Sequence, residues 1–448
     1  MILLQGYAPV LSKLLKDQRL QEGASYRLMH FVVQQSVEEG LLLYNVLTRA
    51  VVLLSPEEGQ MLEGNPSSIP ELISKWFVVP LDHDDRKLAK EVRAVGKMLE
   101  KKHKGISDYT ILTTTDCNAH CFYCYEKGRK RISMKEETAE KVAAFIIRNA
   151  QDGKVSLRWF GGEPLYNKSP ISVICQRIKA AGIDYNSAMV SNGYLFDDAT
   201  IAEAVGLWNL EKVQVTLDGS EEVYNRSKAF IYAEGSAYRR VLGNIHHLLD
   251  SGIQVSVRLN IGRHNADNLL ELADILTAEF GGQKRFGVYS HTLFGVSSKE
   301  LEVSPPDGQR LELFEARMRL QEKLKGGKIA IKGKLPRALK LHRCMADNDA
   351  SIVILPDGHL GKCEHYSDDH WIGHLASLKR NEKVLADFKR LREEIDACAD
   401  CPLYPDCFRL ALCEVAVHCY PEEREEMLEN VRETLLDFYR KKKDEVSV

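Results

Sequence analysis

The sequence lacks any long hydrophobic run, and none of its apolar stretches approaches the roughly 18 residues that a membrane-spanning helix needs. It also lacks an excess of positive charge, because 61 Lys and Arg face 64 Asp and Glu, for a formal net charge of −3. Nucleic-acid-binding proteins usually carry a basic patch, so we expect neither nucleic acid nor a membrane as partner. The first residues lack the basic-then-apolar order of a signal peptide. We therefore expect a cytoplasmic protein.

Cysteine, in contrast, is abundant, with eleven in the chain. Disulfides are rare in the cytosol, and clustered cysteines in a cytosolic protein usually indicate metal binding. The clusters are Cys117, Cys121 and Cys124; Cys344 and Cys363; and Cys398, Cys401, Cys407, Cys413 and Cys419. Cys175 stands alone on a predicted helix, and we interpret it as a core or surface thiol.

The 448 residues are too many for one ordinary domain. Six predicted strands alternate with helical segments in the central part, which indicates the α/β class with a parallel sheet, as an open, partial (β/α)6 barrel. The site of such a fold lies at the C-terminal ends of its strands. The predicted organisation is a winged-helix-like module at 1–95, a helical linker at 96–107, the barrel at 108–292, a connecting helical segment at 293–343 and a cysteine-rich domain at 344–448.

Some local features are also predicted. Residues 30–54 are expected to form two strands around a turn. Ser55 followed by Pro56 predicts a helix start, and Ser133 with Glu136 three residues later has the spacing of a capping box.

The first cysteine group has the spacing Cys-x3-Cys-x2-Cys and follows the first strand of the central region. Three thiolates are one short of the four ligands of a structural zinc site. On a four-iron cluster, three protein ligands leave one iron open to a small molecule. A zinc site completed by His120 is the alternative.

With Tyr123 before its last cysteine, this loop resembles the signature of the radical S-adenosylmethionine (SAM) superfamily. The resemblance implies a 4Fe-4S cluster on Cys117, Cys121 and Cys124 whose open iron binds SAM. It also implies that reduction yields a 5′-deoxyadenosyl radical, which abstracts hydrogen from a substrate. Further segments match the family at the strand ends. The SAM contacts implied are Tyr123, the GGEP segment of Gly161, Gly162, Glu163 and Pro164, and then Ser191, Asn192, Asp218, Arg258 and Asn260. For the residues after the GGEP segment, the alternative is that they form an ordinary barrel rim without a role in SAM binding.

The C-terminal cysteines resemble the SPASM extension of radical SAM enzymes that modify peptides, which carries two auxiliary 4Fe-4S clusters. The implied outer-cluster ligands are Cys398, Cys401, Cys407 and Cys419, and the implied inner-cluster ligands are Cys344, Cys363 and Cys413. One departure is that five residues separate Cys407 from Cys413 where the family usually has three. A zinc ribbon on Cys398, Cys401 and Cys407 is the alternative.

The inner cluster is then one ligand short, and its open iron could take a substrate thiolate, since a metal-bound thiol is deprotonated. Water, His365 or an acidic side chain could fill the place instead. Glu364 corresponds to an Asp that acts as base in anaerobic sulfatase maturases, so the resemblance implies a catalytic base here. A solvated surface glutamate is the alternative.

Residues 1–95 resemble the leader-peptide recognition domains of radical SAM maturases, with a structural cap on the barrel as the alternative. The expected function is maturation of a ribosomally synthesised precursor peptide by a crosslink, of which a Cys-to-carbon thioether is the leading form. Carbon–carbon crosslinking and formylglycine formation of the sulfatase type are alternatives, and an iron or redox sensor is the non-enzymatic one. The expected cofactors are SAM and three 4Fe-4S clusters. The expected partners are a precursor peptide with its leader and a flavodoxin- or ferredoxin-like electron donor.

Overall fold

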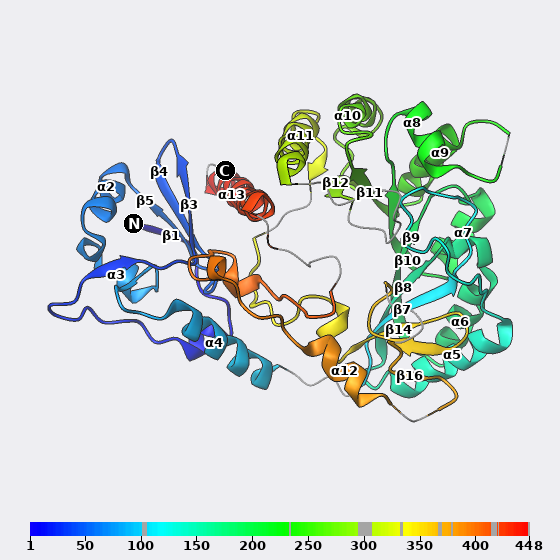
Figure 1. The fold of residues 1–448 in the computed structure, drawn as a ribbon, viewed down its shortest axis with the longest axis horizontal. Coiled ribbons are helices and arrows are strands. Elements are labelled where there is room, and N and C mark those ends of the chain that lie inside the picture. Colours follow the sequence, from blue (N-terminus) through cyan, green and yellow to red (C-terminus); the bar gives the residue numbers. More distant parts are fainter. Residues whose placement is uncertain are drawn as a thin grey trace. The chain divides into compact units, whose positions relative to one another are not determined.

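The computed structural model describes residues 1–100, 105–232, 234–293, 307–331, 335–365, 370–377, 380–413, 419 and 421–446 (Figure 1). The chain forms two compact units. One unit combines residues 1–102, 333–343 and 390–448, and the other combines 103–332 and 344–389. The cysteine-rich segment 344–448 is therefore divided between the units. Within the described residues, no helix is both long and apolar enough to cross a membrane.

The unit of residues 103–332 and 344–389 alternates strands and helices. Its elements are β7 (Asp108–Thr114), α5 (Glu136–Asn149), β8 (Lys154–Gly161), η2 (Pro164–Asn167), α6 (Ser169–Ala180), β9 (Asp184–Ser191), α7 (Asp198–Gly206), β10 (Leu210–Thr216), α8 (Glu221–Lys228), α9 (Ala237–Asp250), β11 (Gln254–Ile261), α10 (Asn268–Phe280), β12 (Phe286–Thr292), α11 (Asp307–Gly326), β13 (Ala330–Ile331), η3 (Met345–Asp347), β14 (Ser351–Ile354), β15 (His359–Gly361), β16 (Gly373–His374) and α12 (Glu382–Lys389).

These strands form one sheet in the order β13-β12-β11-β10-β9-β8-β7-β14-β15-β16. The strands from β7 to β12 lie in sequence order and pair in parallel, which confirms the parallel sheet expected from the sequence. Beyond β7, the later strand β14 also pairs in parallel, with Ser351 opposite Asp108. The antiparallel strands β15 and β16 then extend this edge. The chain after Cys344 thus returns to the start of the sheet.

The core of this unit lies between the sheet and its helices. On α5, Val142, Ala143 and Ile146 are buried, and Cys175 on α6 is fully buried, so it is a core thiol. The predicted capping box is wrong. The N-cap of α5 is Lys135, without a side-chain cap, because the hydroxyl of Ser133 bonds with that of Thr114 at 2.9 Å.

The other unit contains β1 (Ile2–Gln5), α1 (Leu11–Leu14), β2 (Tyr26–Leu28), β3 (Val32–Val37), β4 (Gly40–Asn45), β5 (Val51–Leu54), α2 (Pro56–Gly64), η1 (Pro66–Ser68), α3 (Pro70–Ser74), β6 (Val78–Pro80), α4 (Asp85–Leu99), η4 (Asp396–Cys398), η5 (Tyr404–Asp406) and α13 (Pro421–Val446). Residues 30–54 contain three strands rather than the predicted two. The predicted start of α2 is confirmed, with Ser55 as N-cap and Pro56 at the first turn.

The main sheet of this unit has the antiparallel order β1-β5-β4-β3, and both of its faces are buried. Alternate residues point to opposite faces of a strand. Accordingly, Leu43 and Val52 join a core with α2, α3 and α4, whereas Leu42 and Val51 join a second core. That second core contains Leu428, Leu435 and Tyr439 of α13, which therefore covers the second face.

The segment that carries Cys398, Cys401 and Cys407 packs on the N-terminal part of the same unit. Arg49 is fully buried and donates hydrogen bonds to the carboxylate of Asp406 at 2.9 and 2.5 Å. The rings of Phe31 and Tyr404 stack with centroids 5.9 Å apart. Arg93 donates to the carbonyls of Tyr404 and Pro405.

Candidate active site

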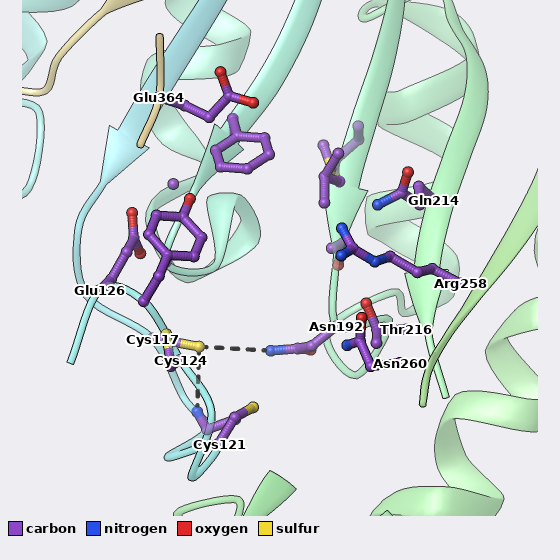
Figure 2. A pocket seen from close by; sticks show the side chains of 18 of the residues that line it. Cys117, Cys121, Cys124, Glu126, Asn192, Gln214, Thr216, Arg258, Asn260 and Glu364 are labelled. Atoms are coloured by element: carbon purple, nitrogen blue, oxygen red, sulfur yellow. Dashed lines mark hydrogen bonds between the residues drawn. The ribbon is translucent and has the colours of Figure 1, made fainter. Parts of the chain in front are cut away.

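The Cys117–Cys124 loop leaves the end of β7 and lines a cavity of about 470 Å³. The opposite wall comes from the strands of the parallel sheet. Figure 2 shows the cysteines, Glu126 and Glu364 along one side and the labelled strand residues along the other. The polar and charged residues that line the cavity are Cys117, Cys121, Tyr123, Cys124, Tyr125, Glu126, Arg158, Ser191, Asn192, Lys212, Gln214, Thr216, Lys228, Arg258, Asn260, Glu364 and His365.

Gly161 and Gly162 let the end of β8 lie directly against the strand that leads into the cysteine loop. A Cβ atom at Gly161 would lie 2.1 Å from the carbonyl oxygen of Thr114, and one at Gly162 would lie 2.3 Å from that of Asp116. Gly161 also has a φ of 131°, which favours glycine. Backbone hydrogen bonds from Gly162 to Thr114 and from Glu163 to Asp116, both 3.0 Å, close this contact. The two glycines therefore fix the height of the loop above the sheet.

Glu163 lies behind the cavity wall, fully buried, and ties the ends of β8 and β9 together. Its carboxylate accepts hydrogen bonds from the Ser191 hydroxyl at 2.9 Å, from the Asn192 backbone N–H at 2.7 Å and from the Leu165 N–H at 3.1 Å. Burial nevertheless raises the pKa of Glu163 to about 7. Pro164 follows it as the first residue of η2 and is also buried. These two residues hold the strand ends in place from behind.

The cavity wall presents polar atoms whose bonding capacity is not used within the described chain. The Nε atom of Arg258 and the Oδ1 atom of Asn260 are buried there without a hydrogen-bond partner. Asn192 donates to the Asn118 side chain at 2.6 Å, and its Nδ2 atom is 3.8 Å from the Cys117 sulfur. Buried polar groups are normally hydrogen-bonded. These strand ends therefore fit a polar ligand bound beside the cysteine loop.

Tyr123 and Asp218 form a buried network with Lys228, which the sequence did not single out. The Lys228 ammonium lies 2.9 Å from the Asp218 carboxylate and 2.6 Å from the Tyr123 hydroxyl, which in turn donates to Asp218. Burial is the largest single effect and would lower the pKa of Lys228, but the charge and hydrogen bond of Asp218, together with Cys121 and Cys117, outweigh it and the pKa is raised. Asp218 is absent from the cavity wall and contacts Lys228 instead.

The cysteines of the loop are thiols in the metal-free protein at neutral pH. Burial raises the pKa of Cys117 to about 12 and that of Cys124 to about 11, and it also raises the pKa of Cys121. Binding of iron would therefore release their protons. Three thiols on one loop beside unsatisfied polar atoms are a donor set that fits a 4Fe-4S cluster with SAM.

The zinc alternatives find no support in the part of the chain that the structure describes. No group of three or more His, Cys, Asp or Glu side chains there could hold a single metal ion. His120 is exposed and does not line the cavity. A four-iron cluster attaches each thiolate to a different iron, so its ligands need not converge on one point.

Glu364 and His365 lie in the same cavity as the cysteine loop, although more than two hundred residues separate them along the chain. Arg129 joins the two segments, since its guanidinium donates to the carbonyls of both residues. The rings of Tyr125 and His365 lie 4.4 Å apart. Glu126 lines this wall as well, and burial raises its pKa to about 7.

The remaining cysteines lie in both units. Cys344 and Cys363 belong to the unit of the parallel sheet, whereas Cys413 belongs to the other unit. Burial raises the pKa of Cys401 and of Cys407, and the nearby Cys419 raises both further, as do Cys398 for Cys401 and Cys401 for Cys407. These four cysteines are the set that the SPASM resemblance assigns to one cluster. None of the eleven cysteines forms a disulfide in the part of the chain that the structure describes.

Several cavity residues were missed from the sequence, chiefly Glu126, Arg158, Lys212, Gln214 and Lys228. A signal existed for Lys212 and Gln214, since they alternate with the apolar Val213 and Val215 on a predicted strand. No comparable signal marks Lys228, which is the last residue of the short helix α8.

Residues 111–276 match the family model of the Radical SAM superfamily. Among curated proteins, the GTP 3′,8-cyclase of Clostridium perfringens (strain 13 / Type A) is 24% identical over 275 residues, which are 58% of this chain and 81% of that protein. The probable GTP 3′,8-cyclase of Methanocaldococcus jannaschii is 27% identical over 180 residues, which are 40% and 57% of the two chains.

Among solved structures, native anSMEcpe with bound AdoMet matches with a TM-score of 0.57 at 12% identity, over 75% of this chain and 99% of that one. Streptococcus suis SuiB matches with a TM-score of 0.52 at 14% identity, over 87% and 96%. These likenesses concern the fold.

The family match and the cysteine loop over the ends of the parallel strands define a radical SAM domain. The protein is a radical SAM enzyme through this domain, which the family model matches over residues 111–276.

Proposed function

We propose that the protein is a maturase that installs a crosslink, most simply a Cys-to-carbon thioether, in a ribosomally synthesised precursor peptide. The observation that carries this proposal is the shared cavity of the Cys117–Cys124 loop and Glu364. It brings a carboxylate beside the second cysteine group, next to Cys363, into the space where SAM would bind.

Each part of the cavity wall has a distinct role in this proposal. Cys117, Cys121 and Cys124 would hold the 4Fe-4S cluster, and Asn192 after β9 and Arg258 on β11 would orient SAM. When bound, the cluster and SAM supply a 5′-deoxyadenosyl radical that removes a hydrogen atom from the substrate. Glu364 accepts the proton that leaves the substrate thiol. The phenyl ring of Phe160 and the side chain of Leu293, which also line the cavity, limit the access of water.

The other cysteines belong to two auxiliary 4Fe-4S clusters in this proposal. Cys398, Cys401, Cys407 and Cys419 would hold the outer one, which is supported by the effect of Cys398, Cys401 and Cys419 on the pKa values of Cys401 and Cys407. Cys344, Cys363 and Cys413 would hold the inner one, which would keep one place for the substrate sulfur and accept the electron that is left over when the carbon radical joins that sulfur. A flavodoxin- or ferredoxin-like protein supplies the electron that SAM cleavage needs.

The winged-helix-like module at 1–95 is proposed to recognise the leader. Strand β3 pairs only with β4 among the described strands, so its other edge offers unpaired backbone groups to an extended peptide. The structure of Streptococcus suis SuiB bound to precursor peptide SuiA has a similar fold, with a TM-score of 0.51. It supports leader recognition by analogy of fold alone.

The first test is the iron and sulfide content of anaerobically purified protein, with a SAM-cleavage assay. About twelve irons are expected, at four per cluster, and about eight after joint replacement of Cys117, Cys121 and Cys124 by Ala. Only the wild type is expected to produce 5′-deoxyadenosine. About four irons, all lost in the triple variant, would refute the auxiliary clusters and the thioether proposal with them.

Formylglycine formation is the competing chemistry, because it can use the same carboxylate. A cysteine-containing peptide encoded beside the gene separates the two. A thioether keeps the sulfur in the peptide but blocks its alkylation, whereas formylglycine formation from Cys removes the sulfur. The mass of the product therefore decides between them.

A further inference from the structure

The cavity carries two cations that the SAM site does not use. Arg158 on β8 and Lys212 on β10 both line it, on the wall formed by the sheet. Both residues are in register with Ala188 of the intervening strand β9. In-register residues of parallel strands point to the same face of the sheet. The two cations therefore flank one small side chain.

This arrangement leaves room for a ligand between the cations. Two strand spacings put their Cα atoms about 10 Å apart, and the methyl group of Ala188 does not fill the interval. The long side chains of Arg158 and Lys212 can both reach a group that lies above Ala188. Arg158 is exposed and Lys212 half-buried, so both are accessible to a ligand.

Neither cation is neutralised by a residue in the described part of the chain. Among the described residues, Arg158 and Lys212 make no ion pair and no side-chain hydrogen bond, in contrast to Lys228 with its buried carboxylate. A guanidinium offers a planar pair of donors that matches a carboxylate, and an ammonium adds a point charge.

The cation pair is separated from the SAM site along the strands. Lys212 lies four residues before Thr216, which is in register with Arg258 near the cysteine loop. At a rise of about 3.3 Å per residue this is about 13 Å. Val190 and Gln214, which are in register with each other, lie between the two levels and also line the cavity.

We propose that Arg158 and Lys212 form an anion subsite that binds an acidic side chain of the substrate peptide. The subsite rests on the proposed function, since it assigns a substrate class to the same cavity. The spacing places this acidic residue within about four extended residues of the position that faces the cysteine loop. The enzyme thus selects a peptide segment with an Asp or Glu near the modified residue.

The test measures the binding of acetyl-Gly-Glu-Gly-amide to the whole chain by nuclear magnetic resonance at low ionic strength. Acetyl-Gly-Gln-Gly-amide and inorganic phosphate are the matched probes. We expect the Glu peptide to bind about tenfold tighter than the Gln peptide, because only the carboxylate makes charge-assisted hydrogen bonds. Arg158→Gln and Lys212→Gln are each expected to remove this preference.

Two further variants make the result specific. Ala188→Glu puts a carboxylate of the protein between the cations and is expected to abolish the preference without removing either cation. Lys179→Gln changes an exposed lysine on α6 and is expected to bind as the wild type does.

Equal binding of the Glu and Gln peptides by the wild type would overturn the proposal, as would an unchanged preference in Arg158→Gln and Lys212→Gln. Binding of phosphate without the Glu peptide would also overturn it and would identify a phosphorylated substrate instead. SAM cleavage by the wild type tests the proposed function independently. If the wild type does not cleave SAM but still prefers the Glu peptide, the proposed function is refuted. If it cleaves SAM but shows no preference for the Glu peptide, only the subsite is refuted.

Discussion

The buried ion pair of Lys228 and Asp218 allows a quantitative prediction. Both residues are almost inaccessible to solvent, at 3% and 0% exposure, and their charged groups lie 2.9 Å apart. In Lys228→Met the carboxylate stays buried without its counter-charge, and one of its oxygens already lacks a hydrogen-bond partner among the described residues. Removal of one partner from a buried pair costs about 3–5 kcal/mol. We expect this loss in the free energy of unfolding.

The double variant Lys228→Met/Asp218→Leu separates the ion pair from packing. It leaves no unpaired charge, and apolar replacement of a buried ion pair is often close to neutral. The two single changes are therefore expected to be strongly non-additive, with the double variant more stable than their sum by about 2 kcal/mol or more.

The assay is urea unfolding of the metal-free, reduced protein, followed by circular dichroism. Lys212→Met is the matched control, because Lys212 lines the same cavity without an ion pair among the described residues. It is expected to lie within about 0.5 kcal/mol of the wild type. The reasoning is refuted if Lys228→Met costs less than about 1 kcal/mol, or if the two single changes simply add.

Three other predictions concern residues around the site. Glu163 is expected to lower the free energy of unfolding by about 3 kcal/mol between about pH 4.5 and 7, because the folded state retains the proton that the unfolded chain releases. Buried Glu126, whose pKa is also raised to about 7, adds a similar share to the slope of the wild type. Glu163→Gln is expected to remove the Glu163 share of this slope, and a slope equal to that of the wild type in urea unfolding would contradict the pKa shift. Arg49→Met leaves Asp406 without its buried partner and is expected to cost about 3 kcal/mol; thermal unfolding measures it, and an unchanged midpoint would count against the ion pair. Gly162→Ala is expected to abolish SAM cleavage and lower iron content because its Cβ would meet backbone, whereas Gly206→Ala, with open space around it, retains both; equal activity of the two variants would disprove this role.

The parallel sheet could be predicted from the sequence because each of its strands alternates or concentrates apolar residues between polar turns. The cysteine loop and the GGEP segment could be placed on strand ends for the same reason. Contacts between distant side chains could not be predicted in this way. Nothing in the sequence around Lys228 indicates that it pairs with Asp218, because the pairing depends on the fold that brings the end of α8 to the segment after β10.

The third strand within residues 30–54 was missed because the apolar run 41–54 looks continuous. Asn45 interrupts it, since its side-chain oxygen accepts hydrogen bonds from the N–H groups of Leu47 and Thr48. Arg49 then adopts a φ of 70°, which completes the reversal. Asn commonly makes such turns, but its neighbours Val46 and Leu47 are apolar and hide the signal.

The capping box was misplaced for a related reason. The Ser133 hydroxyl had two possible partners, the start of α5 and the end of β7, and only the folded chain shows that Thr114 takes it. The local sequence spacing points to the start of α5 as the partner, but it carries no information about Thr114 on β7.

The packing of α13 on the N-terminal sheet has a consequence for biosynthesis. Roughly four hundred residues separate Val33 from Leu435, although both belong to one core, and contacts at such separation form late in folding. As the chain leaves the ribosome, the strands β3 to β5 emerge long before the helix that covers one of their faces. That apolar face stays uncovered by α13 while the whole radical SAM domain is translated. We therefore expect chaperones to bind the nascent N-terminal segment during this time.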